Sequence, residues 1–306
     1  MKKLTTIAAA LAAAVLPLSA QENLTQNVVY PAFNSIKVTG NFEVTIKDAP
    51  EYCVDFDATA ACNGTFKANV EKGCLVFTVD QANFDKAAKA AGKGIKNFTP
   101  LLRATISMPV SDLTEISLSD ESSFSIMGQI VPASKLVVNL DGKAVVKRID
   151  ANCQTLTLNI TDKAIANITT NARTTTVNAS KDANSTLSID SGLLTVNAEG
   201  KASTIVNGNF DKAELNVANS SSTKLEGSCK RLSIEGKKGN VDASTLSLDD
   251  ADVNLNGTTV RVAAKEDLKI NVENSAYLVI FNNPKLELVK VKDSSVLRPS
   301  DDKKKK

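Results

Sequence analysis

The 306-residue sequence contains no histidine and no tryptophan, and only 4% of its residues are aromatic. Without histidine there is no Ser-His or Cys-His catalytic pair, although lysine or carboxylate catalysts stay open. The formal net charge is only +2, whereas nucleic-acid binding needs a basic field and aromatic stacking platforms. We therefore expect no nucleic-acid partner, and the sequence names no catalytic, cofactor-binding or metal-binding residue; any ligand-binding residues stay unknown.

Glycine and proline are also scarce, with 14 and 8 residues, which is too few for a low-complexity linker protein. The calcium-binding nonapeptide repeat, phosphate-cradling loops and dinucleotide fingerprints are absent. Hydrophobic residues nevertheless make up 42% of the chain. This content predicts a folded protein with a substantial core.

A long apolar run occurs only near the start of the chain. Lys2 and Lys3 precede an apolar run over 4–16, and Leu18-Ser19-Ala20, which ends in small residues, precedes Gln21. The run is shorter than the roughly 20 residues that span a bilayer, so the pattern is typical of a cleavable signal peptide at 1–20. We expect an exported protein, in the periplasm, at the cell surface or secreted, with no transmembrane segment in the mature chain.

The five cysteines are Cys53, Cys62, Cys74, Cys153 and Cys229. Their odd number leaves at least one free or paired between chains. The absence of CxxC spacing and of histidine argues against zinc. Export permits disulfides, and a bridge among the first three cysteines is the candidate, but we favour free cysteines buried as small core residues.

The first part of the expected mature chain predicts a small β unit at 33–110, after a short leader at 21–32. Apolar and polar residues alternate over 33–46 on both sides of Gly40, the period-2 pattern of half-buried strands. Further strands are expected at 52–56, 65–70, 74–79 and 101–108. An Ala- and Lys-rich excursion at 82–98 predicts a short surface helix or irregular segment.

Seven asparagines recur with steps of 20, 19, 19, 19, 38 and 17 residues, where 38 is twice 19. Glu235 occupies the skipped position, and extrapolation places Ser119 before the series and Val289 after it. A constant period identifies stacked repeats. We predict ten coils over 111–298, followed by a charged tail at 299–306. The asparagines are Asn139, Asn159, Asn178, Asn197, Asn216, Asn254 and Asn271.

Each repeat alternates apolar residues with its asparagine, as Val138 and Leu140 do around Asn139. The alternation predicts a strand that turns its apolar residues inward and its asparagine outward. A turn such as 141–143 and a shorter strand such as 145–149 complete the coil. The prediction is an all-β parallel β-solenoid with coils of about 19 residues; an antiparallel sandwich is the alternative.

Two further columns follow from this alignment. Stacked asparagines can bond to one another along the axis, so we interpret their column as a register device. Burial of a Val or Leu stabilises by roughly 1.5–3 kcal/mol, more than a net hydrogen bond at about 0.5–1.5 kcal/mol, so the apolar columns should hold the stack together. Small residues at the corner recur at Ala144, Ala164, Ala183, Ala202, Ser221, Thr259, Ala276 and Ser294.

Candidate chemistry in the repeat is sparse. Asp250 and Asp252 would share one strand face and could hold a cation or act as a catalytic pair, but no third ligand is placed beside them. We favour a solvated charged turn, and we interpret Asp120-Glu121 and the pair Asp48 and Glu51 in the same way. The outward Asn and Thr strip is a minority candidate for a polymer-binding surface.

The segment 33–46, which contains Val38-Thr39-Gly40-Asn41-Phe42-Glu43-Val44, is followed by 63–79 and 104–109. In this order the segments resemble the family of the "putative auto-transporter adhesin, head GIN domain", a domain of unknown function, over about 33–297. The resemblance implies a secreted or envelope-associated bacterial protein with a right-handed parallel β-helix-like body, and it carries no catalytic residues.

Two functional hypotheses follow from these observations. The first is an exported, non-enzymatic β-solenoid that acts as an adhesin-like binding or scaffold protein at the cell envelope. Its candidate partners are a surface glycan or an envelope protein. The alternative is a polysaccharide-active β-helix enzyme, a lyase or hydrolase. Converging carboxylates with Lys or Arg in a cleft would favour the enzyme.

Overall fold

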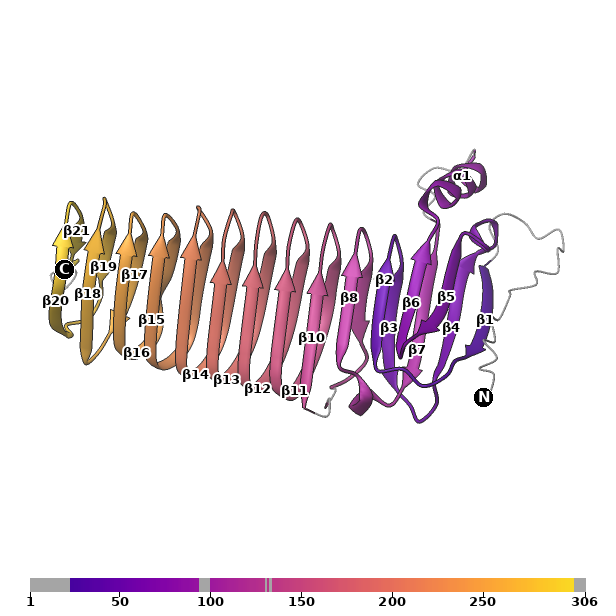
Figure 1. Cartoon of the computed structure of the whole chain (residues 1–306), viewed down its shortest axis with the longest axis horizontal. Helices are drawn as coiled ribbons and strands as arrows, with labels where there is room; N and C mark the ends of the chain where they lie inside the picture. The colour runs from indigo at the N-terminus through magenta and orange to yellow at the C-terminus, as the bar shows by residue number, and fades with distance from the viewer. Residues whose placement is uncertain (1–22, 94–99, 130, 132–133, 300–306) are drawn as a thin grey trace, which may run out of the picture.

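A computed structural model describes residues 23–93, 100–129, 131 and 134–299 of the chain. The described strands form one continuous 21-stranded sheet that winds into an elongated β-solenoid (Figure 1). About nine coils stack at a spacing of roughly 19 residues, where the extrapolated register predicts ten. The predicted all-β parallel solenoid is confirmed. The expected signal peptide at 1–20, and residues 300–306 of the expected tail, lie outside the described residues.

One side of the solenoid, here called the asparagine face, carries the asparagine column. Its strands follow one another in space by parallel pairing from β2 onward, with β5 and β6 added antiparallel to each other at the N-terminal end. In spatial order they are β5 (Phe66–Glu71), β6 (Cys74–Val79), β2 (Ser35–Thr39), β8 (Glu115–Ser119), β10 (Lys135–Leu140), the second halves of β11 (Val145–Ile160), β12 (Ile165–Ala179), β13 (Asn184–Ala198), β14 (Ser203–Ala218), β15 (Ser222–Lys237) and β16 (Asn240–Asn256), then β18 (Asp267–Glu273) and β20 (Lys285–Lys292).

The other side, here called the opposite face, is built from the first halves of the same long strands. Each long strand therefore crosses from one face to the other within a single coil. In spatial order this face contains β1 (Asn23–Val29), β4 (Cys53–Thr59), β7 (Leu102–Met108), β3 (Glu43–Asp48), β9 (Ser123–Ile126), the first halves of β11 to β16, then β17 (Thr259–Ala264), β19 (Tyr277–Ile280) and β21 (Ser295–Leu297).

The core lies between the two faces and consists of stacked apolar columns. Leu194 and Val196 are fully buried, as are the residues at the same positions of most other coils. The partners in the neighbouring coil are in register, for example Val177 with Val196. The predicted inward phase of the apolar residues is therefore confirmed. A few inward positions hold polar residues instead; Thr175 is one of them, and its fully buried hydroxyl has no hydrogen-bond partner.

The extrapolated ends of the asparagine column are wrong. Asn139 pairs with Ser117 rather than Ser119, because the first full repeat is longer and its additional residues lie outside the paired strands. Asn271 pairs with Lys290, because Val289 is an extra residue at a bulge in β20. Extrapolating a fixed period cannot register such insertions.

Tight turns join the asparagine face to the opposite face at one edge of the stack. Asp162, Lys181 and Gly200 occupy equivalent positions there with φ of +60°, +59° and +70°. A Cβ on Gly200 would come within 2.9 Å of the Lys181 backbone nitrogen, so glycine fits the closest approach. The small residues predicted beside these turns are buried or half-buried, except that Thr258, not Thr259, takes the buried position.

The N-terminal region differs from the prediction in two respects. The expected leader at 21–32 contains strand β1, which pairs antiparallel with β4. Its residues are mostly exposed, so backbone hydrogen bonding rather than apolar alternation forms this edge strand. In addition, β2 and β3 pair in parallel with β8 and β9, so they form a coil of the solenoid rather than part of a separate unit.

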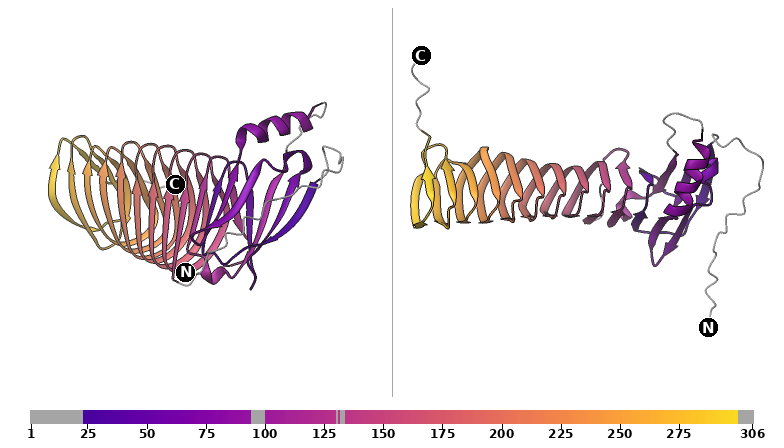
Figure 2. Two further views of the ribbon diagram at one scale, coloured as in Figure 1. Left: turned by 45° about the vertical axis from the view of Figure 1, so that its right-hand side comes forward. Right: turned by 90° about the horizontal axis from the view of Figure 1, so that it is seen from above.

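The remaining N-terminal strands and one helix lie at this end of the solenoid (Figure 2). Helix α1 spans Gln81–Ala91, so it begins one residue before the excursion expected at 82–98, and residues 94–98 of that excursion lie outside the described residues. Asp80 caps the helix by accepting a hydrogen bond from the Asn83 N–H at 3.1 Å, and Phe84 is buried. Short 3-10 helices occur at Ala60–Cys62 and Val110–Asp112.

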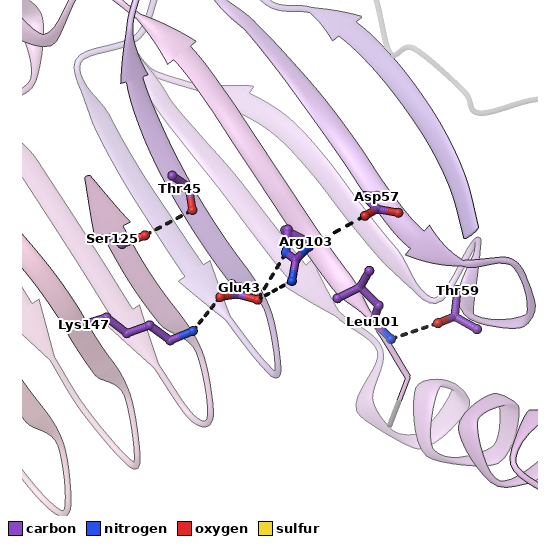
Figure 3. Close-up of polar contacts among 8 residues, drawn as sticks. All are labelled: Glu43, Thr45, Asp57, Thr59, Leu101, Arg103, Ser125 and Lys147. Carbon is purple, nitrogen blue, oxygen red and sulfur yellow. Dashed lines mark hydrogen bonds and ion pairs between the residues drawn. The ribbon is translucent and has the colours of Figure 1, made fainter. Parts of the chain in front are cut away.

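A row of charged side chains on the opposite face, here called the polar strap, connects this end to the following coils (Figure 3). It consists of Lys147, Glu43, Arg103 and Asp57. Glu43 accepts hydrogen bonds from Lys147 at 2.5 Å and from Arg103 at 3.2 Å. Arg103 also lies 3.9 Å from Asp57. The strap therefore links β11, β3, β7 and β4, which are far apart in sequence.

All five cysteines are free in the structure, so the candidate bridge among Cys53, Cys62 and Cys74 is not formed. Cys62, Cys153 and Cys229 are buried. Burial raises the pKa of the Cys229 thiol to about 11 and also raises the pKa of Cys153. These side chains pack as small core residues. Among the described residues, none of the helices has the length and hydrophobicity that a membrane crossing requires.

Candidate binding groove

A groove of about 1230 Å³ runs along the asparagine face, parallel to the solenoid axis. It follows the asparagine column and the neighbouring polar column two residues further along each strand, from β2 to β15. The first column contributes Lys37, Ser117, Asn139, Asn159, Asn178, Asn197, Asn216 and Glu235. The second contributes Thr39, Ser119, Asp141, Thr161, Ser180, Glu199, Ala218 and Lys237.

The asparagine ladder, defined as Asn139, Asn159, Asn178, Asn197 and Asn216, forms the floor of this groove. The side-chain amide of each asparagine from the second onward donates to the side-chain oxygen of the preceding one, at 2.7–2.8 Å. The predicted register ladder is therefore present. Each interior amide still has a second N–H and a spare lone pair, so the ladder repeats a donor and an acceptor about every 4.8 Å.

The ladder has one direction and a defined start. The Asn139 amide donates to the Glu115 carboxylate at 2.8 Å and to the Ser117 hydroxyl at 3.0 Å. Every amide of the ladder thus points its bonded N–H toward the N-terminal end. At the other end, Glu235 interrupts the series, and the Asn254 amide donates to its carboxylate at 2.9 Å.

Charged groups of the groove are spread along its length. Asp141 and Glu199 lie three coils apart, about 14 Å at the spacing of parallel strands. Glu235 lies two coils beyond Glu199 and in the other column. Glycosidases hold their two carboxyl groups roughly 5–9.5 Å apart, so the groove carboxylates do not converge as a catalytic pair of that kind.

The acidic residues singled out in the sequence do not form a metal site. Asp250 and Asp252 lie on the same strand face, with Arg231 and Ser233 as their partners in the preceding coil. No group of three His, Cys, Asp or Glu side chains suited to a metal ion occurs in the part of the chain that the structure describes.

The other acidic candidates have structural partners or solvent contact. Glu121 forms an ion pair with Lys143 at 2.7 Å beside a tight turn. Asp120 lies in that turn with its backbone in the left-handed conformation, at φ of +60°. Asp48 accepts a hydrogen bond from the Val110 N–H at 3.0 Å. Glu51 is exposed.

A second groove of about 730 Å³ follows the corner where the long strands bend. Its charged side chains are largely paired within the solenoid: Lys230 contacts Asp211 at 2.6 Å, and Asn209 donates its backbone and side-chain N–H groups to Asp190 at 2.9 and 2.8 Å. Most charged side chains of the corner groove are therefore engaged with neighbouring side chains.

Sequence reasoning placed the Asn and Thr strip correctly as an outward surface, but its Thr column, two residues before the asparagines, does not line the groove; the polar column two residues after them does. Sequence reasoning also missed the N-terminal end of the groove. Lys37 and Thr39 belong to β2, which had been assigned to a separate unit. The signal was present, because they alternate with the buried Ile36 and Val38 as the polar columns of the repeat do.

A family model described as "putative auto-transporter adhesin, head GIN domain" matches residues 32–188 and 175–284 of the chain. No curated protein matches the chain. Among solved structures, a "putative adhesin" from Parabacteroides merdae is 13% identical, with 91% of this chain and 97% of that chain covered and a TM-score of 0.47.

Two structures from Parabacteroides distasonis are also similar. A "putative adhesin" is 16% identical, with 92% of this chain and 98% of that chain covered and a TM-score of 0.45. A "putative lipid binding protein" is 14% identical, with 91% and 97% covered and a TM-score of 0.43.

Proposed function

Because the chain belongs to the "putative auto-transporter adhesin, head GIN domain" family, we propose that it is an exported, non-enzymatic, adhesin-like protein of the cell envelope. Its binding surface is the asparagine groove, and its ligand is an extended, hydroxyl-rich polymer such as a surface glycan. The family description supports the adhesin-like role. The ligand class comes from the groove itself.

The observation that supports this assignment most strongly is the coincidence of the groove with the asparagine ladder over successive coils. A linear polymer with regularly spaced hydroxyl groups can both donate to and accept from such an array. The lining contains no aromatic residue, so binding would depend on hydrogen bonds and contact with many coils rather than on ring stacking.

The enzyme alternative finds less support in the same groove. Its carboxylates are distributed over separated coils, and its lysines, Lys37 and Lys237, stand at opposite ends. A single reacting bond would not meet two of the carboxylates at the separation that glycoside hydrolysis uses. A long ligand could contact all of them in turn.

The direct test is binding of the protein to a glycan array and to envelope polysaccharides, with a variant that fills the groove. Ser180→Tyr would place a ring halfway along the groove, whereas Ser188→Tyr adds the same ring on the opposite face. We expect Ser180→Tyr to weaken binding at least about tenfold, or about 1.4 kcal/mol, and Ser188→Tyr to bind like the wild type. Binding to no surface polymer, equal binding by both variants, or turnover of a polymer would contradict the proposal.

A further inference from the structure

The asparagine ladder is interrupted at one step, between Asn216 and Glu235. These residues are direct partners on neighbouring parallel strands, about 4.8 Å apart in backbone position. At every other step from Asn139 to Asn216, an amide N–H lies between the two side chains. A glutamate carboxylate accepts hydrogen bonds and donates none, so no N–H fills this step.

Two acceptors therefore face each other at the interruption. The Asn216 amide donates to Asn197 in the preceding coil, so a donor to the Asn216 side-chain oxygen would have to come from the following coil. No described residue donates to that oxygen. One carboxylate oxygen of Glu235 is bonded to the Asn254 amide at 2.9 Å, and the other has no described donor. Both side chains are exposed and line the groove.

The charge of Glu235 is also unpaired among the described residues, unlike that of Glu214 and Glu226 nearby. Glu214 contacts Lys212 at 2.5 Å, and Glu226 contacts Lys224 at 2.6 Å. Lys237 lies two residues beyond Glu235 on the same strand face and lines the groove without contacting that carboxylate within ion-pair distance.

We propose that this step is a subsite for a primary ammonium group carried by the extended ligand, which makes an amino-bearing glycan the preferred ligand class. The inference rests on the proposed function of the groove. An ammonium group has three donors and a positive charge, so it can bond to both acceptors and balance the carboxylate. A hydroxyl group has a single donor, and Ca²⁺ takes six to eight oxygen ligands, more than this step provides.

The test compares two oligosaccharides of equal length, one of β-linked glucosamine and one of β-linked N-acetylglucosamine, by calorimetry below the pKa of the sugar amine. We expect the wild type to bind the glucosamine oligomer about fivefold more tightly, the scale of an exposed ion pair. Glu235→Gln should lose most of this preference, because its amide can donate to Asn216 and restore the ladder; the part that remains comes from Asp141 and Glu199 in the same groove. Glu214→Gln removes the same charge outside the groove and should keep the preference.

The outcomes separate this inference from the proposed function. If the wild type binds both oligomers equally, the groove binds glycans but the ammonium subsite is wrong. If Glu214→Gln lowers the preference as much as Glu235→Gln does, the preference reflects overall charge and the subsite is again wrong. Binding of neither oligomer would overturn both the subsite and the glycan assignment of the groove.

Discussion

The apolar core of the solenoid is covered at its N-terminal end and exposed to solvent at its C-terminal end. At the N-terminal end, Phe42 is fully buried and its ring lies 5.4 Å from that of Phe66 and 5.3 Å from that of Phe77. At the C-terminal end, no described strand lies beyond β20 and β21. Leu288, which continues an inward column, is 62% exposed there.

This difference shows that the repeat cannot close its own core. Each coil buries its inward residues against two neighbours, so an end coil needs other material to cover it. Strands β4 to β7 and their phenylalanines supply that cover at one end. At the other end, β20 carries a bulge and Lys285, Lys290 and Lys292, features that discourage the addition of further strands.

The largest predicted effect contrasts the two ends directly. Phe42→Ala removes a buried ring from the aromatic cluster and should lower the free energy of unfolding by about 3–5 kcal/mol. Leu288→Ala removes an exposed side chain from the last described coil and should cost less than about 0.5 kcal/mol. Denaturant melts of both variants measure this; similar losses would mean that the C-terminal end is covered as well as the N-terminal end.

The middle coils provide a scale between these extremes. Val196 is fully buried between Val177 and Leu215 of the two neighbouring coils. Val196→Ala should therefore lower the free energy of unfolding by roughly 1.5–3 kcal/mol. Asn197→Ala removes both ladder hydrogen bonds of Asn197 and should cost about 0.5–1.5 kcal/mol in total, because water in the open groove can replace them. We expect the valine change to cost at least twice the asparagine change in denaturant melts. Equal losses would contradict the view that apolar columns hold the stack and asparagines set its register.

A buried polar side chain offers a change of opposite sign. The Thr175 hydroxyl is buried without a hydrogen-bond partner, and Thr175→Val replaces it by a methyl group of similar size. We expect the midpoint of thermal unfolding to rise, with a gain of about 1 kcal/mol in stability. Thr176→Val, on the outward position beside it, serves as the control and should change little. A loss of stability on Thr175→Val would indicate a hydrogen bond that the static structure does not contain.

The smallest predicted effect concerns the strap at the N-terminal end. The hydrogen bond from Lys147, followed by that from Arg103, holds the pKa of Glu43 below its usual value. A lowered pKa stabilises the folded state above the unfolded pKa, and this contribution is lost as the pH falls through the folded pKa. Glu43→Gln should cost less than about 1 kcal/mol at neutral pH, because the partners are partly exposed.

The strap prediction is checked by melts of the wild type and Glu43→Gln across the acidic range. The difference in stability should shrink as the pH falls below the ordinary range of a glutamate. A difference that stays constant with pH would mean that Glu43 acts through packing rather than charge.

Periodicity predicted the coils well because one structural unit repeats and each unit imposes the same demands on its sequence. Asn178 and Asn197 occupy the same ladder position because both strands have the same length and register. The prediction was wrong where a coil gains a residue, as at Val289, or where backbone pairing forms a strand without an apolar pattern, as in β1. The bulge shifts the apolar alternation by one residue between Leu288 and Val291, which a fixed period does not follow, and β1 has no apolar alternation to read.

The candidate site was only partly predictable for a related reason. The outward Asn column could be inferred, but Lys37 joins it through a pairing of β2 with β8 across 80 residues of sequence. The direction of the ladder, and therefore the meaning of Glu235, depends on which amide donates to which oxygen. Sequence spacing contains no information on that direction.

Hydrogen exchange along the native chain tests the central contrast between a covered and an open end most directly. We predict that amides in β2, β7 and the middle coils exchange slowest, and that protection decreases from β16 through β18 to β20 and β21. Opening free energies should follow the same gradient, because local opening is easiest where burial is lowest. Equal protection at both ends, or faster exchange in β2 and β7 than in β20, would contradict this account.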